Sequence, residues 1–188
     1  MKNKELYQQK IFSMESSFTH IRLSDTFTPA FLRKFKCSDT YLNQFLERRA
    51  RKHQNELLAV TYLVFNEQTN LIGYYTLSSD SMPATDVIRS KFTNGKLYHS
   101  YPAIKIGRFA INGKYKGFNY GSIVMDFIKY RFANIQQEVA SRYLLVDAYN
   151  NDKVLSFYKE KNNFEFWTKE DKDSNTRLMY YDLMKSKI

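Results

Sequence analysis

Residues 114–122 read Lys-Tyr-Lys-Gly-Phe-Asn-Tyr-Gly-Ser, and this short stretch decides the fold prediction. Four of the six glycines of the 188-residue chain lie between Gly107 and Gly121. Glycines this close together indicate a backbone that bends sharply or approaches another group closely. Lysines precede the glycines and an apolar run follows them, so we predict a strand-to-helix loop that can hold an anion. An ordinary glycine-capped turn is the alternative.

The sequence on both sides of this loop predicts a pair of parallel strands. Residues 102–112 alternate as a strand does, but the large apolar side chains change from even to odd positions after Ile106. This phase change predicts a β-bulge near Gly107, unless the strand is buried on both faces. An amphipathic helix is expected over 123–135 and a buried central strand over 143–148. Strand, loop, helix and strand in this order form a right-handed crossover.

The rest of the chain completes a single mixed domain. Strands are predicted over 18–23, 57–65, 71–77, 164–167 and 176–183, and helices over 39–53 and 152–161. Residues 80–100 are expected to connect two of these elements and to hold a short helix. We therefore expect one α/β or α+β domain over 18–188, preceded by a polar N-terminal tail over 1–17.

The composition limits the classes of partner. The chain has 29 Lys and Arg against 19 Asp and Glu, a net charge of +10. This charge favours an anionic ligand, a nucleic acid or an acidic surface, although many small cytoplasmic proteins are basic without a specific reason. A lone cysteine fits a reducing cytoplasm, and three scattered histidines predict no metal site. No apolar run approaches the roughly 20 residues of a membrane span, so we expect a cytoplasmic protein without membrane contact.

A basic segment, residues 48–53, ends the helix predicted from Asp39. Cations in the last turns of a helix complement its dipole and remain solvated, which is the simpler interpretation. Contact with nucleic acid is the alternative.

Two familiar phosphate-binding loops are excluded. The nucleotide triphosphatase loop ends in Gly-Lys-Ser/Thr, whereas Gly121 is followed by Ser122 and Ile123. The dinucleotide fingerprint needs Gly-x-Gly-x-x-Gly after an early strand, and the spacing here differs. Downstream, Asn151 is expected to cap a short helix whose Tyr158 faces the sheet near the ends of the parallel strands, where open α/β sheets bind ligands. A core aromatic is the simpler interpretation of Tyr158.

Together these stretches resemble the GCN5-related N-acetyltransferase (GNAT) superfamily, from about Phe18 to Leu183. Lys116-Gly-Phe-Asn-Tyr-Gly121 stands in place of the family's Gln/Arg-x-x-Gly-x-Gly/Ala loop, with Lys for Gln or Arg and Asn119 for the central Gly. Asn151 and Tyr158 match the pattern Asn-x-x-Ala-x-x-x-Tyr. Residues 157–164 resemble the Phe-Tyr-x-Lys-x-Gly-Phe box, with Asn163 for Gly.

Further stretches extend the resemblance. Residues 106–111 resemble the family strand whose backbone aligns the pantetheine. Residues 35–46 and 72–77 are similar to a subgroup that includes acetyltransferase toxins acting on aminoacyl-tRNA.

The resemblance implies a GNAT fold, that is, a mixed, mostly antiparallel sheet with a splayed parallel strand pair, flanked by helices. It also implies acetyl-CoA as co-substrate and no metal. Tyr158 would be the catalytic residue, donating a proton to the departing CoA thiolate, a task suited to a phenol with an ordinary pKa. The implied cofactor-binding residues are Phe109, Ala110, Ile111, Lys116, Gly117, Phe118, Asn119, Tyr120, Gly121, Ser122 and Asn151.

The general base is left open. Asp147 and Glu67 are candidates by residue type only, and a water chain or an already neutral amine would serve equally well.

Three functions follow from the resemblance. The first is acetyl transfer from acetyl-CoA to a primary amine of a small molecule or protein. The alternative is a toxin of a toxin–antitoxin pair that acetylates aminoacyl-tRNA, with tRNA and either an antitoxin or a second copy of the chain (a homodimer) as partners. The second alternative is a non-catalytic acetyl-CoA-binding module, suggested by Asn119 and Asn163.

Overall fold

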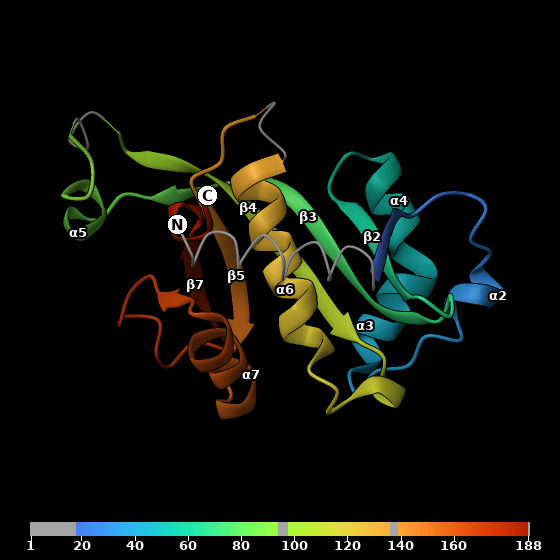
Figure 1. Cartoon of the computed structure of the whole chain (residues 1–188). Coiled ribbons are helices and arrows are strands. Elements are labelled where there is room, and N and C mark those ends of the chain that lie inside the picture. The colour runs from blue at the N-terminus through green and yellow to red at the C-terminus, as the bar shows by residue number, and fades with distance from the viewer. Residues whose placement is uncertain (1–17, 94–97, 136–138, 188) are drawn as a thin grey trace, which may run out of the picture. The chain divides into compact units, whose positions relative to one another are not determined.

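The computed structural model describes residues 18–93, 98–135 and 139–187. These residues form one seven-stranded sheet with the strand order β1-β2-β3-β4-β5-β7-β6 (Figure 1). Their contacts divide them into two compact units, which are described separately: the first holds residues 18–78 and 106–128, and the second the described residues of 79–105 and 129–187. The tail predicted over 1–17 lies outside the described residues, and the single domain stays a prediction.

The first unit consists of short helices and strands. They are β1 (Phe18–Arg22), α2 (Pro29–Leu32), α3 (Thr40–Gln44), the π-helical η1 (Phe45–Arg49), α4 (Ala50–Asn55), β2 (Val60–Asn66), most of β3 (Leu71–Pro83), the second half of β4 (Ser100–Ile111), the 3-10 helix η3 (Gly113–Tyr115) and the start of α6 (Tyr120–Tyr130).

The second unit contains the remaining elements. They are α5 (Asp86–Arg89), the first half of β4, the π-helical η4 (Arg131–Ile135), β5 (Tyr143–Tyr149), α7 (Asp152–Ser156), the π-helical η5 (Phe157–Lys161), β6 (Glu165–Phe166), β7 (Thr176–Asp182) and η6 (Leu183–Ser186). Within the described residues, no helix combines the length and the apolar character that crossing a membrane requires.

The predicted fold class is confirmed. The pairs β1–β2, β2–β3, β5–β7 and β6–β7 are antiparallel. β4 and β5 pair in parallel, with Ala103–Lys105 opposite Tyr143–Leu145. This pairing covers only a quarter of the 12-residue β4, which agrees with a parallel pair that separates. The buried positions of β4 change from odd (Tyr101, Ala103) to even (Ile106, Ala110), which is before Gly107 and in the opposite sense to the change read from the sequence, so the bulge near Gly107 stays a prediction.

Each unit has its own apolar core. In the first unit, Phe45, Leu46 and Ala50 of the helical segment pack with Leu63 of β2 and Tyr74 of β3. The Asp39 side chain caps this segment, because it accepts the N–H groups of Tyr41 and Leu42, as the sequence predicted. In the second unit, the aromatic side chains of Tyr101, Tyr143 and Tyr180 pack with Met82 and Leu145.

One local prediction was wrong and one short helix was missed. The strand predicted from Leu57 begins only at Val60, because α4 runs on to Asn55 and the turn that follows takes up Leu57 and Leu58. Leu57 has a φ of +57°, which is incompatible with a strand, and its side chain is exposed. The sequence analysis also missed α2, a four-residue helix that Thr28 caps.

A close approach of β3 and β4 fixes the strand that leads to the glycine-rich loop. A Cβ atom added to Gly73 would lie 2.8 Å from both the Ala110 carbonyl oxygen and Ile111 Cδ1. A contact this short with backbone requires the strands to move apart. Gly73 is therefore needed for the packing of β4 and not for an unusual backbone conformation.

Replacing Gly73 by alanine should lower the free energy of unfolding by about 1–3 kcal/mol, because the new methyl group meets the backbone of β4. Gly113→Ala is the matched control, since its Cβ would lie 3.4 Å from the Lys36 carbonyl oxygen and should cost about 0.5 kcal/mol or less. Urea unfolding of both variants measures the difference. Equal midpoints would contradict the close approach.

Candidate functional site

The glycine-rich loop is anchored at its start by Asn112, which is only 6% exposed. Its backbone N–H donates to the Ile72 carbonyl oxygen at 2.8 Å, and its side-chain N–H donates to that of Leu71 at 3.3 Å. Its Oδ1 accepts the N–H of Lys114 at 3.2 Å. These bonds join the end of β4 to β3 and start the turn of η3, so Asn112 determines where the loop leaves the sheet. The sequence analysis missed this role.

The loop presents a row of unbonded backbone N–H groups. Those of Gly117, Phe118, Asn119, Tyr120 and Gly121 have no hydrogen-bond acceptor among the described residues. Gly117 has a φ of +93° and Asn119 a φ of +60°, so left-handed residues alternate with others along this row. Successive N–H groups in such a conformation form a concave anion-binding nest, and α6 begins at Tyr120 with its positive dipole end beside them. The loop therefore has the donors that an anion needs.

The side chains of the loop add charge and aromatic surface. Lys114 and Lys116 are exposed, and within the described part of the chain neither pairs with a carboxylate. Phe118 is 64% exposed and stacks on Tyr120, with ring centroids 5.9 Å apart. Ser122 donates its N–H to the Asn119 carbonyl oxygen in the first turn. The positive charge and the free N–H groups thus lie in the same segment.

The predicted strand residues lead directly into this loop. Phe109, Ala110 and Ile111 form the end of β4 in the first unit, together with residues 116–122. Ala110 is buried in the core below the helices, whereas Phe109 and Ile111 are half-buried. The structure thus brings the predicted strand and loop residues into one unit.

Asn151 and Tyr158 belong to the second unit. Asn151 caps α7, because its Oδ1 accepts the N–H of Val154 at 3.1 Å, so helix capping alone already accounts for this residue. Tyr158 follows in η5, is 8% exposed, and packs against Phe157 and Phe164.

The Tyr158 hydroxyl has no hydrogen-bond partner among the described residues, although its ring is buried. Burial raises the pKa of the Tyr158 phenol above its ordinary value, whereas the sequence analysis assumed an unperturbed group. The phenol therefore stays protonated at every pH near neutrality. It can donate a hydrogen bond or a proton, but it cannot act as a base.

The two candidate bases differ in their surroundings. Asp147 on β5 forms an ion pair with Lys105 on β4, which also belongs to the last pair of the parallel register, and the Lys105 Nζ lies 3.7 Å from Asp80 Oδ2. Glu67 is exposed in the turn between β2 and β3. Neither observation assigns a base. Among the described residues, no group of three or more His, Cys, Asp or Glu side chains could hold a metal ion.

The basic segment 48–53 is largely committed to local contacts. Arg51 pairs with Asp25 at 3.1 Å, Lys52 lies 3.8 Å from Glu56, and Arg48 lies 3.9 Å from Glu47. Arg49 differs, because it has no carboxylate partner within the described residues and instead lies over the Tyr41 ring.

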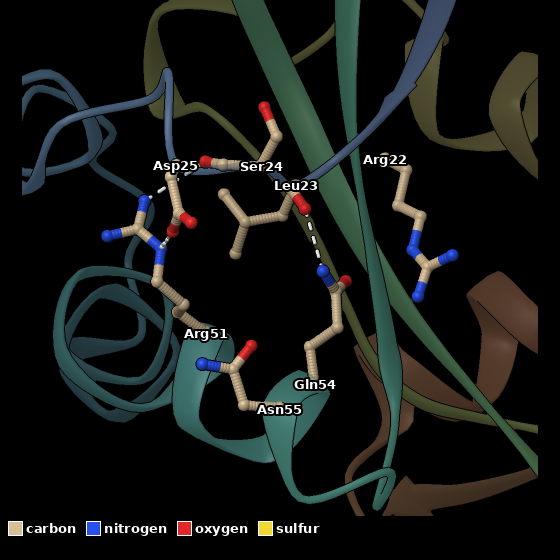
Figure 2. A pocket seen from close by; sticks show the side chains of 7 residues that line it. All are labelled: Arg22, Leu23, Ser24, Asp25, Arg51, Gln54 and Asn55. Atoms are coloured by element: carbon tan, nitrogen blue, oxygen red, sulfur yellow. Dashed lines mark hydrogen bonds and ion pairs between the residues drawn. The ribbon is translucent and has the colours of Figure 1, made fainter.

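A separate pocket of about 320 Å³ lies beside the end of β1 and α4 (Figure 2). Its lining is formed by Arg22, Leu23, Ser24, Asp25, Arg51, Gln54 and Asn55. Arg51 donates to the carbonyl oxygens of Ser24 and Phe27, and Gln54 donates to that of Leu23 while accepting the N–H of Thr61. These polar side chains join β1 to α4, which is a structural role.

Comparison with solved structures identifies proteins with the same fold. A tyrosine-to-phenylalanine mutant of KacT matches with a TM-score of 0.72 and 22% sequence identity, over 90% of this chain and 97% of that chain. AtaT complexed with acetyl-methionyl-tRNAfMet matches with a TM-score of 0.70 and 22% identity, over 89% and 96%. A similar mutant of the AtaT toxin, bound to acetyl-CoA and the C-terminus of the antitoxin AtaR, matches with a TM-score of 0.69 and 22% identity, over 90% and 95%.

No family model matches the sequence. The structural likeness covers nearly the whole of each chain, so the GNAT fold predicted from the sequence is confirmed.

Tyr158→Phe should leave the free energy of unfolding within about 0.5 kcal/mol of the parent value, because the hydroxyl bonds to nothing in the described structure. Tyr74→Phe is the control. The Tyr74 hydroxyl donates to the Leu42 carbonyl oxygen at 2.8 Å, and its loss should cost about 1–3 kcal/mol. Thermal and urea unfolding distinguish the two. A large loss in the Tyr158 variant would show that its hydroxyl serves the fold.

Proposed function

We propose that the protein is an acetyl-CoA-dependent N-acetyltransferase that acetylates the amino group of aminoacyl-tRNA. The observation that carries the proposal is the row of free N–H groups from Gly117 to Gly121 on this fold. A pyrophosphate is a doubly charged acceptor with several oxygens, so it can bind several of these groups at once. Lys114 and Lys116 supply charge for the same group.

The choice of acceptor rests on the neighbouring structures and on charge. AtaT is described in complex with acetyl-methionyl-tRNAfMet and with acetyl-CoA, and it shares the fold of this chain over most of its length. The net charge of +10 favours a polyanionic acceptor over a small amine. A toxin held by an antitoxin therefore accounts for more observations than a generic acetyltransferase acting on small amines or proteins. A tRNA acceptor also places the reaction in the cytoplasm.

The two departures from the family pattern weigh against a non-catalytic module. Asn119 and Asn163 stand where glycine is usual, and they have φ values of +60° and +56°. Asparagine tolerates this left-handed conformation better than other non-glycine residues. Both turns therefore keep the backbone that glycine would give them.

In the proposed mechanism the residues of this chain bind, orient and supply a proton. The backbone of Phe109 and Ile111 would orient the thioester, and a main-chain N–H there would stabilise the oxyanion. Asn151, whose Oδ1 caps α7, keeps its amide N–H groups for the co-substrate or for positioning Tyr158. Tyr158 would protonate the departing thiolate. Burial raises its pKa, so the phenol holds its proton before the reaction, but the same shift makes it a weaker acid towards the thiolate than an ordinary phenol.

Acetyl transfer to aminoacyl-tRNA tests the function directly. The purified protein is incubated with labelled acetyl-CoA and either aminoacyl-tRNA, deacylated tRNA, a polyamine or a lysine-containing peptide. We expect label on aminoacyl-tRNA alone, and a decrease in kcat of about 100-fold or more in Tyr158→Phe with little change in acetyl-CoA affinity. Label on the polyamine or peptide alone would favour the generic acetyltransferase, and acetyl-CoA binding without any transfer would favour the non-catalytic module.

The backbone of the loop can be tested at Asn119. Asn119→Gly should bind acetyl-CoA at least as tightly as the parent, because glycine takes up a φ of +60° without strain. Asn119→Val should bind at least about 10-fold more weakly, because a β-branched residue resists this conformation. Isothermal titration calorimetry measures both constants. A clear loss of affinity in the glycine variant would mean that the Asn119 side chain itself binds the ligand.

A further inference from the structure

Two arginines that pair with no carboxylate of residues 18–93, 98–135 or 139–187 converge on Tyr41 in the first unit. Arg108 donates from Nη2 to the Tyr41 hydroxyl at 3.0 Å, and its guanidinium carbon lies 3.7 Å from the centre of the Phe45 ring. The guanidinium carbon of Arg49 lies 4.6 Å from the centre of the Tyr41 ring. We call Tyr41, Phe45, Arg49 and Arg108 the arginine cluster.

Local structure holds this cluster in place. The Asp39 cap starts α3, which positions Tyr41 in its first turn at 42% exposure. The π-helical segment η1 runs from Phe45 to Arg49, so both cluster residues on this segment lie at its ends. Single π-helical turns inside α-helices occur frequently at functional sites. Phe45 is fully buried and supports the Arg108 guanidinium from below.

The next feature of the cluster is its charge. Arg49 and Arg108 pair with no carboxylate among the described residues, unlike Arg48 and Arg51. Asp39 is the acidic residue that acts on Tyr41, but its carboxylate already accepts two backbone N–H groups of α3. The cluster therefore carries two positive charges that no carboxylate in the described part of the chain pairs with.

Arg108 also has an unused donor. Its Nε atom is buried and has no hydrogen-bond acceptor among the described residues. A buried guanidinium N–H without an acceptor is costly, and because Nε is shielded from solvent, the fold itself carries this cost. The hydrogen bond from Arg108, followed by the charges of Arg108 and Arg49, lowers the pKa of Tyr41, which agrees with a strongly positive environment.

We infer that the arginine cluster binds a backbone phosphate of the RNA acceptor, close to the nucleotide that carries the aminoacyl group. This inference rests on the proposed function. Guanidinium groups bind phosphate through two parallel N–H···O bonds, and the exposed Tyr41 ring offers a surface on which an unpaired base can stack. An unpaired 3′ end supplies both groups.

The position of Arg108 on β4 gives the phosphate a defined place relative to the reaction. Arg108 precedes Phe109, and adjacent side chains on a strand point to opposite faces. Arg108 lies over Phe45 and Ala110 is buried in the same core, so this face of β4 is the one covered by the helices. The phosphate would therefore lie on the helix-covered face of β4. Its place is next to Phe109, whose backbone is proposed to orient the thioester.

Kinetics with two kinds of acceptor test the inference. Arg49→Gln and Arg108→Gln should each raise the KM for aminoacyl-tRNA by about 10-fold or more. Each should also reduce the salt dependence of tRNA binding by the amount expected for about one phosphate contact. Arg108→Lys should be intermediate, because lysine keeps the charge but loses the paired donors. With methionine methyl ester, which has no phosphate, kcat/KM should be unchanged. Lys34→Gln removes one exposed charge from the same unit and is the control. It should leave KM and kcat/KM with both acceptors unchanged.

Binding without turnover separates this inference from the proposed function. Fluorescence anisotropy with a labelled single-stranded RNA ending in CCA should show about 10-fold weaker binding for Arg49→Gln. If the parent protein transfers no acetyl group to aminoacyl-tRNA, the proposed function fails, while the RNA measurement still decides the phosphate subsite. RNA binding and KM equal to the parent in both glutamine variants would overturn the subsite. An equal loss of activity with methionine methyl ester would also overturn it. So would glutamine variants that lose binding to an acidic peptide but keep the binding of RNA.

Discussion

The candidate site depends on the hydrogen bonds of Asn112. This buried residue bonds through its backbone to Ile72, and through its side chain to Leu71 and to the N–H of Lys114. The end of β4 is thereby joined to β3, and the following residues turn away from the sheet before α6 begins. Because the loop residues between η3 and α6 make few internal hydrogen bonds, their N–H groups remain available. An anion-binding loop of this kind needs such an anchor, since its own backbone contributes little to its stability.

Two different surfaces meet along β4. Its last residues lead into a loop that is rich in unbonded N–H groups, and its Arg108 projects towards the helical segment that contains Tyr41 and Phe45. The first feature suits a pyrophosphate and the second a phosphodiester. Both lie within the first unit, whereas the proposed proton donor, Tyr158, lies in the second.

The sequence predicted those parts of the site that depend on neighbouring residues. The glycine spacing at 117 and 121, the Asp39 cap and the Asn151 cap are local features, and each has a recognisable residue pattern. The Arg108–Tyr41 contact joins residues 67 positions apart, and the side chain of Asn112 reaches a residue 41 positions away. Such pairs are set by packing between elements, which periodicity does not reveal. The Asn-Gly pair at the end of the strand was a weak local signal for the anchor at Asn112.

The central claim is that the N–H groups from Gly117 to Gly121 bind a pyrophosphate. Backbone amide chemical shifts, followed by NMR during titration with CoA and separately with pantetheine, test it most directly. The account predicts large, saturable shifts of these five amides with CoA and little change with pantetheine, which lacks the pyrophosphate. Equal shifts with both ligands, or none with CoA, would contradict it.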